Sequence, residues 1–129
     1  MYGSGPLKKS IIGDGIILMG EDADADQEIP KFEYAFVSRY LTILEAMGAK
    51  RLVFAVYDNP VKKDYLLQTP YREWIYSVTN SISLSKKIIS LRNDRDEQDK
   101  MIIKAYDWVR IQSWENVMNV YLSLWEKSF

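Results

Sequence analysis

The chain lacks the two residue types that carry much of the nucleophilic and metal chemistry of proteins, because it contains no cysteine and no histidine. Without cysteine there is no disulfide, no thiolate nucleophile and no cysteine-based metal site, which fits a reducing compartment. Without histidine there is no Ser-His-Asp relay and no histidine-ligated zinc. Acid–base chemistry would therefore fall to carboxylates, lysines or tyrosines.

Glu45 is the carboxylate whose position best suits a ligand site. It follows an apolar strand end and lies about one turn into a helix, and a second apolar strand follows at residues 52–56. In a parallel sheet the loops that leave the carboxyl ends of the strands form the ligand crevice, so residues 38–42 and 57–63 would share one rim. We expect Glu45 to face a pocket formed by residues 20–22, 38–42 and 57–59. The alternative is an ordinary solvated helix residue.

An acidic run at residues 21–26, with sequence EDADAD, is a second candidate site. Its alternating aspartates resemble part of a calcium loop, but the glycine at the sixth position and the glutamate at the twelfth are absent. A solvated loop with a helix-capping aspartate is the favoured interpretation. No metal site is predicted.

Aromatic and aliphatic side chains recur at helical spacing from residue 100 to residue 129. Such a stripe could serve as a stacking platform for a base or a sugar, but a core or a contact surface is favoured because buried aromatics dominate packing of this kind. Ser113 marks the expected restart between two helices.

Apolar runs without alternation predict strands buried on both faces, at residues 16–19, 34–37, 52–56 and 74–78. Helical patterns lie between and after them, including residues 61–68 and a helix that ends near Leu91 and is capped by Ser81 or Ser83. A charged break at residues 93–99 indicates a helix start or a solvated face. The predicted fold is α/β, a Rossmann-like parallel sheet with flanking helices.

The composition limits the classes of protein to which the chain could belong. The 129 residues predict a single domain, and 47% hydrophobic with 27% charged residues is typical of a globular chain. A formal charge of -1 without a basic block argues against nucleic acid and anionic membrane as partners. No run of 18 apolar residues suggests a membrane span, and the start MYGSGPLKKS lacks the apolar core of a signal peptide. We expect a cytoplasmic protein.

Several blocks of the chain carry a resemblance to one enzyme family. The segment VSRYLTILEAM, residues 37–47, resembles the segment ending in Leu-Glu-Ala-Met of the group 1 glycosyltransferases, nucleotide-sugar enzymes of GT-B fold. Residues 104–125 are similar to that family's closing pair of helices. Residues 2–7 resemble its Gly-x-Gly-Pro turn, and residues 16–20 resemble the strand that precedes its base-binding loop. Together these blocks cover most of the chain in the family's order.

The resemblance implies the C-terminal half-domain of a GT-B glycosyltransferase, which holds the donor. Residues 1–129 would form one Rossmann-like donor-binding domain, incomplete at its N-terminus. The family's first strand and helix, with the basic pair that meets the donor diphosphate, would precede Met1, and the N-terminal acceptor domain is missing. The implied ligand is a nucleoside diphosphate sugar, a donor substrate, and no cofactor is expected. Sugar transfer by this chain alone is not expected.

Site roles follow from the resemblance position by position. A glutamate at the place of Glu45 binds the donor ribose hydroxyls. The family's second glutamate is replaced by Val37, two glycines are replaced by Ser38 and Tyr40, and Tyr40 adds bulk at the phosphate site. The helix that starts near Leu41 would direct its free N–H groups at the diphosphate. The nucleotide-sugar-binding residues expected are Ser38, Tyr40, Leu41, Thr42, Glu45 and Glu21, and the catalytic residues are unknown.

Two functions therefore stand. The first is a donor-binding domain that resembles a glycosyltransferase and acts only with an N-terminal acceptor domain. The second is a non-catalytic Rossmann-like module that oligomerises, or binds another chain, through its aromatic C-terminal helices, because exposed apolar patches of more than a few hundred Å² tend to be buried in an interface.

Overall fold

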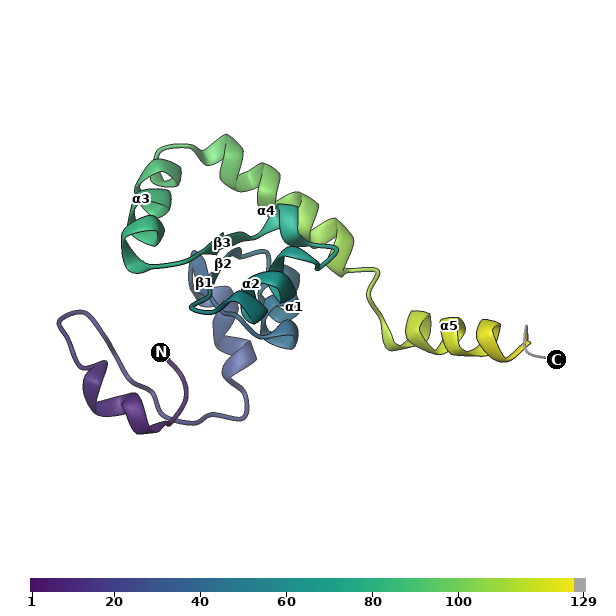
Figure 1. The fold of residues 1–129 in the computed structure, drawn as a ribbon, viewed down its shortest axis with the longest axis horizontal. Helices are drawn as coiled ribbons and strands as arrows, with labels where there is room; N and C mark the ends of the chain where they lie inside the picture. Colours follow the sequence, from purple (N-terminus) through teal and green to yellow (C-terminus); the bar gives the residue numbers. More distant parts are fainter. Residues whose placement is uncertain (127–129) are drawn as a thin grey trace.

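The computed structural model describes residues 1–126 and contains a three-stranded parallel sheet (Figure 1). Its strands are β1 (Tyr34–Phe36), β2 (Leu52–Val56) and β3 (Tyr76–Val78), in the spatial order β1-β2-β3. In register, Phe36 lies beside Phe54 and Phe54 beside Tyr76. The sequence prediction of a Rossmann-like parallel sheet with flanking helices is confirmed.

Each strand is followed by a helix, which is the arrangement that parallel neighbours require. The α-helices are α1 (Tyr40–Gly48), α2 (Pro60–Leu67), α3 (Ser81–Arg92), α4 (Arg95–Val109) and α5 (Trp114–Glu126). Three short 3-10 helices are η1 (Pro6–Ser10), η2 (Ala25–Lys31) and η3 (Arg72–Trp74). The predicted helices at residues 61–68 and 100–129 are confirmed within the described residues, with the restart after Ser113 where it was expected, and residues 127–129 lie outside them.

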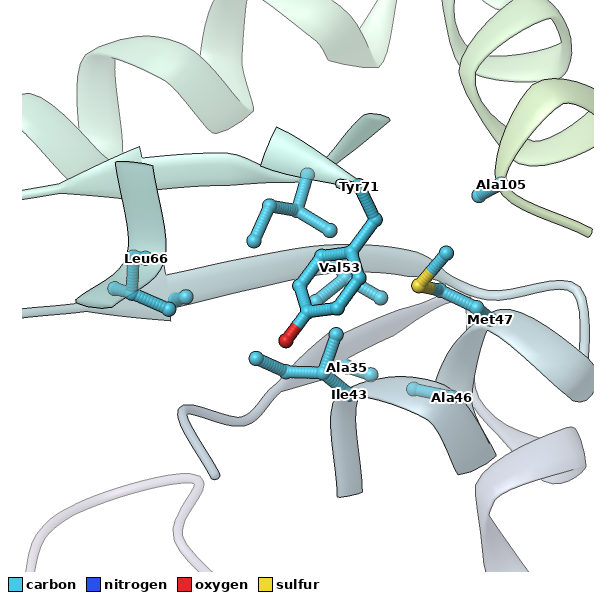
Figure 2. Close-up of a cluster of buried hydrophobic side chains, with 10 residues drawn as sticks. Ala35, Ile43, Ala46, Met47, Val53, Leu66, Tyr71 and Ala105 are labelled. Atoms are coloured by element: carbon cyan, nitrogen blue, oxygen red, sulfur yellow. The ribbon is translucent and has the colours of Figure 1, made fainter. Parts of the chain in front are cut away.

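The larger part of the core lies between the sheet and α1. Tyr71, at the start of η3, is fully buried there, and Figure 2 shows its ring among side chains of α1, β2 and α2. Its ring also contacts Trp108 of α4, with centroids 5.4 Å apart. An aromatic side chain buries a large area, so Tyr71 contributes strongly to a core of this size. The buried members of this cluster are Ala35, Ile43, Ala46, Met47, Val53, Ala55, Leu66, Tyr71, Ile75 and Ala105.

The opposite face of the sheet carries a row of aromatic rings. Phe54 is central and fully buried, and it contacts the rings of Tyr34, Phe36 and Tyr76 at centroid distances of 5.7, 5.5 and 5.4 Å. Leu91 at the end of α3 and Met101 of α4 complete this second cluster with Leu52 and Phe54. Phe36 remains 56% exposed at the β1 edge of this face.

The strand predicted at residues 16–19 is wrong. Residues 16–19 form no strand: the Met19 N–H donates to the Met1 carbonyl at 2.9 Å, and the neighbouring Gly20 forms an isolated parallel bridge with Tyr2. Ile17 is 71% exposed and Met19 is 56% exposed, and the half-buried Leu18 shares a hollow with Pro6 and Leu7 of η1. An apolar run forms a stable strand only when neighbouring strands and a covering layer bury it, and here the neighbouring strands are reduced to one three-residue partner.

Two boundaries also differ from the sequence prediction. The third strand begins at Tyr76 because Trp74 belongs to η3, where its ring contacts Trp108 at 5.8 Å. The helix α3 is capped by Asn80, and not by Ser81 or Ser83 as the sequence predicted. The Asn80 side chain accepts from the Ser83 N–H, and the Ser83 hydroxyl oxygen accepts from the Asn80 N–H, which forms a capping box.

The helix α5 projects from the end of α4 away from the sheet (Figure 1). All of its residues are exposed, in contrast to the core that was one expectation for the aromatic stripe. Within residues 1–126, no helix is both long and apolar enough to cross a membrane.

Candidate functional site

Three helices begin at the carboxyl-end rim of the sheet, because α1, α2 and α3 each follow a strand directly. Two of them are capped by an asparagine side chain. Asn59 accepts from the Lys62 N–H at 2.9 Å at the start of α2, and Asn80 accepts from the Ser83 N–H at 2.9 Å at the start of α3. Their first-turn donors are thus partly satisfied by the protein itself.

The start of α1 is different. Its N-cap residue is Arg39, whose side chain accepts no hydrogen bond from the helix. Tyr40, Leu41 and Thr42 form the first turn, and the Thr42 hydroxyl donates back to the Arg39 carbonyl at 2.9 Å. The first-turn N–H groups of α1 are therefore available to an acceptor from outside, and the helix dipole favours a negatively charged one.

A cation lies beside this turn that sequence reasoning did not identify. The Lys62 ammonium group, from the first turn of α2, donates to the Ser38 hydroxyl at 2.8 Å. Ser38 is the second residue after β1 and lies two residues before α1 begins. The contact joins positions 24 apart in the chain, so no local pattern could have revealed it. The Asn59-Pro60 turn predicts that α2 starts at the rim, but it does not indicate that Lys62 lies near Ser38.

The Tyr40 side chain, at the start of α1, packs against a second aromatic residue. Its ring packs on the ring of Tyr71, with centroids 6.0 Å apart and planes tilted by 50°. Tyr71 is itself buried, and desolvation raises the pKa of its phenol well above the usual range. Tyr40 is thus held on the flank of α1, where it also lines the hollow described next.

Glu45 is exposed and lines a hollow of about 550 Å³ between α1 and the start of α5. Tyr40, Leu41 and Leu44 form the α1 side of this hollow, and residues 112–120 contribute the other side. The predicted partners from residues 20–22 and 57–59 do not line it, so that part of the pocket prediction was wrong. The side chains that do line it come from a segment about 70 positions further along the chain.

The remaining predicted site residues lie elsewhere. Tyr57, Asp58 and Asn59 line a separate hollow of about 310 Å³ at the carboxyl ends of β2 and β3. Glu21 accepts a hydrogen bond from the Ser4 hydroxyl within the N-terminal segment and does not line the Glu45 hollow. The structure therefore brings Tyr40, Leu41 and Glu45 together, places Ser38 and Thr42 at the adjoining turn, and separates Glu21 from them.

The acidic run at residues 21–26 shows no arrangement suited to a cation. The Asp22 carboxylate accepts from the Asp24 N–H at 3.0 Å, and the Asp24 carboxylate accepts from the Gln27 side chain at 3.3 Å. Over residues 1–126, no cluster of three or more acidic side chains has the geometry to hold a metal ion. The Asp22 and Asp24 carboxylates bond to nearby donors, as in a solvated loop, whereas Asp26 belongs to η2 and the N-cap residue Asp24 makes no side-chain capping hydrogen bond.

Comparison with known proteins identifies the fold. No family model matches the chain, and no curated protein matches it by sequence. The crystal structure of the glycosyltransferase TarM matches 95% of the chain with a TM-score of 0.68 and 21% sequence identity. The chain spans 27% of the length of TarM. The fold is therefore glycosyltransferase-like.

Proposed function

We propose that the chain is the nucleotide-sugar donor-binding domain of a glycosyltransferase of GT-B type. The observation that carries the proposal is the uncapped first turn of α1 with the Lys62 ammonium beside it, 2.8 Å from the Ser38 hydroxyl. Backbone N–H groups at a helix start together with a lysine are a common arrangement for binding phosphate groups. The glycosyltransferase-like fold supports this interpretation.

In this proposal each donor group meets a chemically matched partner. The diphosphate oxygens accept hydrogen bonds from the first-turn N–H groups of Tyr40, Leu41 and Thr42 and from Lys62. The Glu45 carboxylate accepts hydrogen bonds from the ribose hydroxyls. Glu45 lies five positions after Tyr40, a rise of roughly 7.5 Å along α1, so one nucleoside diphosphate can contact both.

Sugar transfer by this chain alone is not part of the proposal. Transfer with retention of configuration depends on the orientation of donor and acceptor and on stabilisation of the leaving diphosphate. The chain has Val37 at the position where the resembling family has a glutamate beside the sugar. An acceptor domain is therefore the partner that the proposal requires for activity.

Calorimetric titration of the purified chain with UDP, GDP and ADP tests donor binding. We expect weak binding of one of them, reduced by about 1–3 kcal/mol in Glu45→Ala because a hydrogen bond to a charged group is lost. Lys62→Met should reduce binding of the diphosphate and leave the affinity for the free nucleoside unchanged. Glu73→Ala is the matched control, since Glu73 is an exposed carboxylate of η3 that lines none of the hollows described above.

A second function is favoured by the position of α5. Its residues are all exposed, with Trp114 at 85% and Trp125 at 66%. This surface suits a non-catalytic module that associates through its C-terminal helix. No binding of any nucleoside diphosphate, or binding that is indifferent to Glu45→Ala, would favour this second function over the first.

A further inference from the structure

The hollow at the carboxyl ends of β2 and β3 is not part of the proposed donor site. Its volume is about 310 Å³, and its lining comes from the turn before α2, from the start of α2 and from the residue that follows β3. The lining residues are Tyr57, Asp58, Asn59, Pro60, Lys63 and Thr79. Loops at the carboxyl ends of parallel strands form the ligand crevice of an open α/β sheet, so this hollow has the position of a binding site.

The sheet places Tyr57 and Thr79 side by side. Ala55 and Ser77 are partners in register on β2 and β3, and the Tyr57 N–H donates to the Val78 carbonyl at 3.0 Å, which continues the pairing past the strand ends. Residues two positions apart in a strand share one face, so Tyr57 and Thr79 lie on the same face of the sheet. The Tyr57 side chain is half-buried and packs against the core cluster, so it forms a fixed aromatic wall of the hollow.

Two asparagine side chains orient polar groups at the hollow. Asn59, which caps α2, also donates from its amide nitrogen to the Asp58 carboxylate at 2.8 Å. Asn80, which caps α3, donates in the same way to the Thr79 hydroxyl oxygen at 3.0 Å. Each asparagine therefore holds the side chain of the residue before it, and supporting hydrogen bonds of this kind preorganise a binding site.

The hollow offers both acceptors and donors to a ligand. A carboxylate can accept several hydrogen bonds, so Asp58 can accept more than the one from Asn59. The Thr79 hydroxyl accepts from Asn80 and can still donate its proton. Lys63, an exposed residue of α2, adds an ammonium group. Because Asp58 repels an anion and Lys63 repels a cation, the chemistry favours a neutral ligand rich in hydroxyl groups.

We propose that this hollow binds a saccharide, with Asp58 and Thr79 contacting adjacent hydroxyl groups of a pyranose ring. One hydroxyl donates to the Asp58 carboxylate, the next accepts from the Thr79 hydroxyl, and Lys63 donates to a further oxygen of the ring. The C–H face of the ring packs on Tyr57. A volume of about 310 Å³ is at the lower end of the range for small-molecule sites, which suits one sugar ring.

This saccharide site differs from the sugar position that the family resemblance implies. Val37, where the resembling family has a glutamate beside the donor sugar, follows β1, whereas the hollow lies at β2 and β3. Glu45 and Lys62 do not line it. The pyranose ring comes either from a free saccharide or from a nucleotide sugar bound at α1, since neighbouring strands are only about 4.8 Å apart. The inference stands without the donor function, because a free saccharide needs no diphosphate site.

Residue-resolved NMR of the chain with the methyl α-glycosides of glucose, mannose and galactose tests the proposal. We expect at least one of them, at millimolar concentration, to shift the amide signals of residues 57–63 and 79–80. The signals of residues 40–45, at the start of α1, should stay unchanged. A glycoside that shifts residues 40–45 and leaves residues 57–63 unchanged would overturn the proposal, because the sugar would then bind in the Glu45 hollow.

Variants of the lining make the test specific to the hollow. Asp58→Asn keeps an acceptor for Asn59 but removes the charge, and it should weaken saccharide binding about tenfold. Thr79→Val removes the hydroxyl donor at nearly constant volume and should weaken binding about fivefold. Asp64→Asn is the matched control, since Asp64 is an exposed carboxylate of α2 that does not line the hollow. Equal affinity of Asp58→Asn and Asp64→Asn would overturn the proposal.

Calorimetry with UDP, UDP-glucose, GDP and GDP-mannose distinguishes the two sources of the ring. If the ring belongs to a nucleotide sugar, the nucleotide sugar binds more tightly than its diphosphate, and Asp58→Asn removes that gain without changing the affinity for the diphosphate. If the ring belongs to a free saccharide, a methyl glycoside binds and the gain is absent. Glu45→Ala weakens only the nucleotides, so failure of the donor function is recognised separately. Absence of both glycoside binding and the nucleotide-sugar gain would overturn the saccharide site.

Discussion

Tyr71 combines full burial with a phenol hydroxyl that has no hydrogen-bond partner within the described part of the chain. A buried hydroxyl without a partner has lost its hydration without compensation. Tyr71→Phe should therefore leave the free energy of unfolding unchanged or raise it by about 1 kcal/mol, as measured by urea denaturation. Ile43→Ala, in the same cluster, is the contrasting variant and should lower it by about 2–5 kcal/mol. A large loss in Tyr71→Phe would show that the hydroxyl has a partner.

The ionisation of Tyr76 makes the stability of the folded state depend on pH in the alkaline range. Burial and, to a smaller extent, the Glu97 carboxylate, which accepts from its hydroxyl at 3.3 Å, raise the pKa of Tyr76 to about 12 from 10.0. The neutral phenol therefore stabilises the folded state fully below about pH 10, and this contribution is lost as the pH rises toward 12. In Tyr76→Phe the decline of stability over this range should be less steep, which denaturation midpoints at several pH values would detect. An unchanged slope would contradict the prediction.

At the residue scale, the sequence correctly predicted that Glu45 lies on a helix after a strand. It did not predict which residues lie around Glu45. Local pattern locates a side chain on its own element, and the hollow around Glu45 depends on residues 112–120, which only the folded chain brings near. Lys62 was not predicted for the same reason. Its side chain lies on α2, and it contacts Ser38, which lies between β1 and α1. The binding roles of these residues stay a prediction.

At the scale of elements, the capping box of α3 gives a test with a matched control. Asn80→Ala should lower the free energy of unfolding by about 1 kcal/mol, because the Ser83 N–H loses its acceptor. Ser81, which the sequence pattern predicted as the cap together with the alternative Ser83, lies inside the helix, and Ser81→Ala should have almost no effect. Urea denaturation of both variants distinguishes the two assignments, and the reverse order would support the cap at Ser81.

One strand-helix-strand unit was predicted correctly because the burial of its side chains is decided within the unit. The strands at residues 34–36 and 52–56 and the helix between them pack on one another, so their apolar pattern and their fold agree. The run at residues 16–19 is also apolar but does not form a strand, and Ile16, Ile17 and Met19 remain exposed. Trp74 was assigned to a strand because composition does not reveal its contact with Trp108.

At the scale of the whole molecule, α5 differs from the other α-helices because none of its residues is buried. With 3.6 residues per turn, its polar side chains gather on one side, and its apolar side chains fill the rest of the circumference. The polar set is Glu115, Asn116, Asn119, Ser123 and Glu126. This side has no lysine or arginine, which membrane-surface helices typically carry. We expect the apolar side of α5 to contact a protein surface.

In a solution of the chain alone, we expect a second copy of the chain to cover the apolar side of α5. An isolated helix of 13 residues is only marginally stable in water, so α5 should depend on contacts made by its apolar side. We expect the chain to self-associate at micromolar concentration in analytical ultracentrifugation, with helical circular dichroism that increases with concentration. Tyr121→Asp places a charge on the apolar side and should give a monomer of lower helicity, whereas Asn119→Asp on the polar side should behave as the unmodified chain. A chain that stays monomeric at every concentration, with Tyr121→Asp indistinguishable from it, would contradict association through α5.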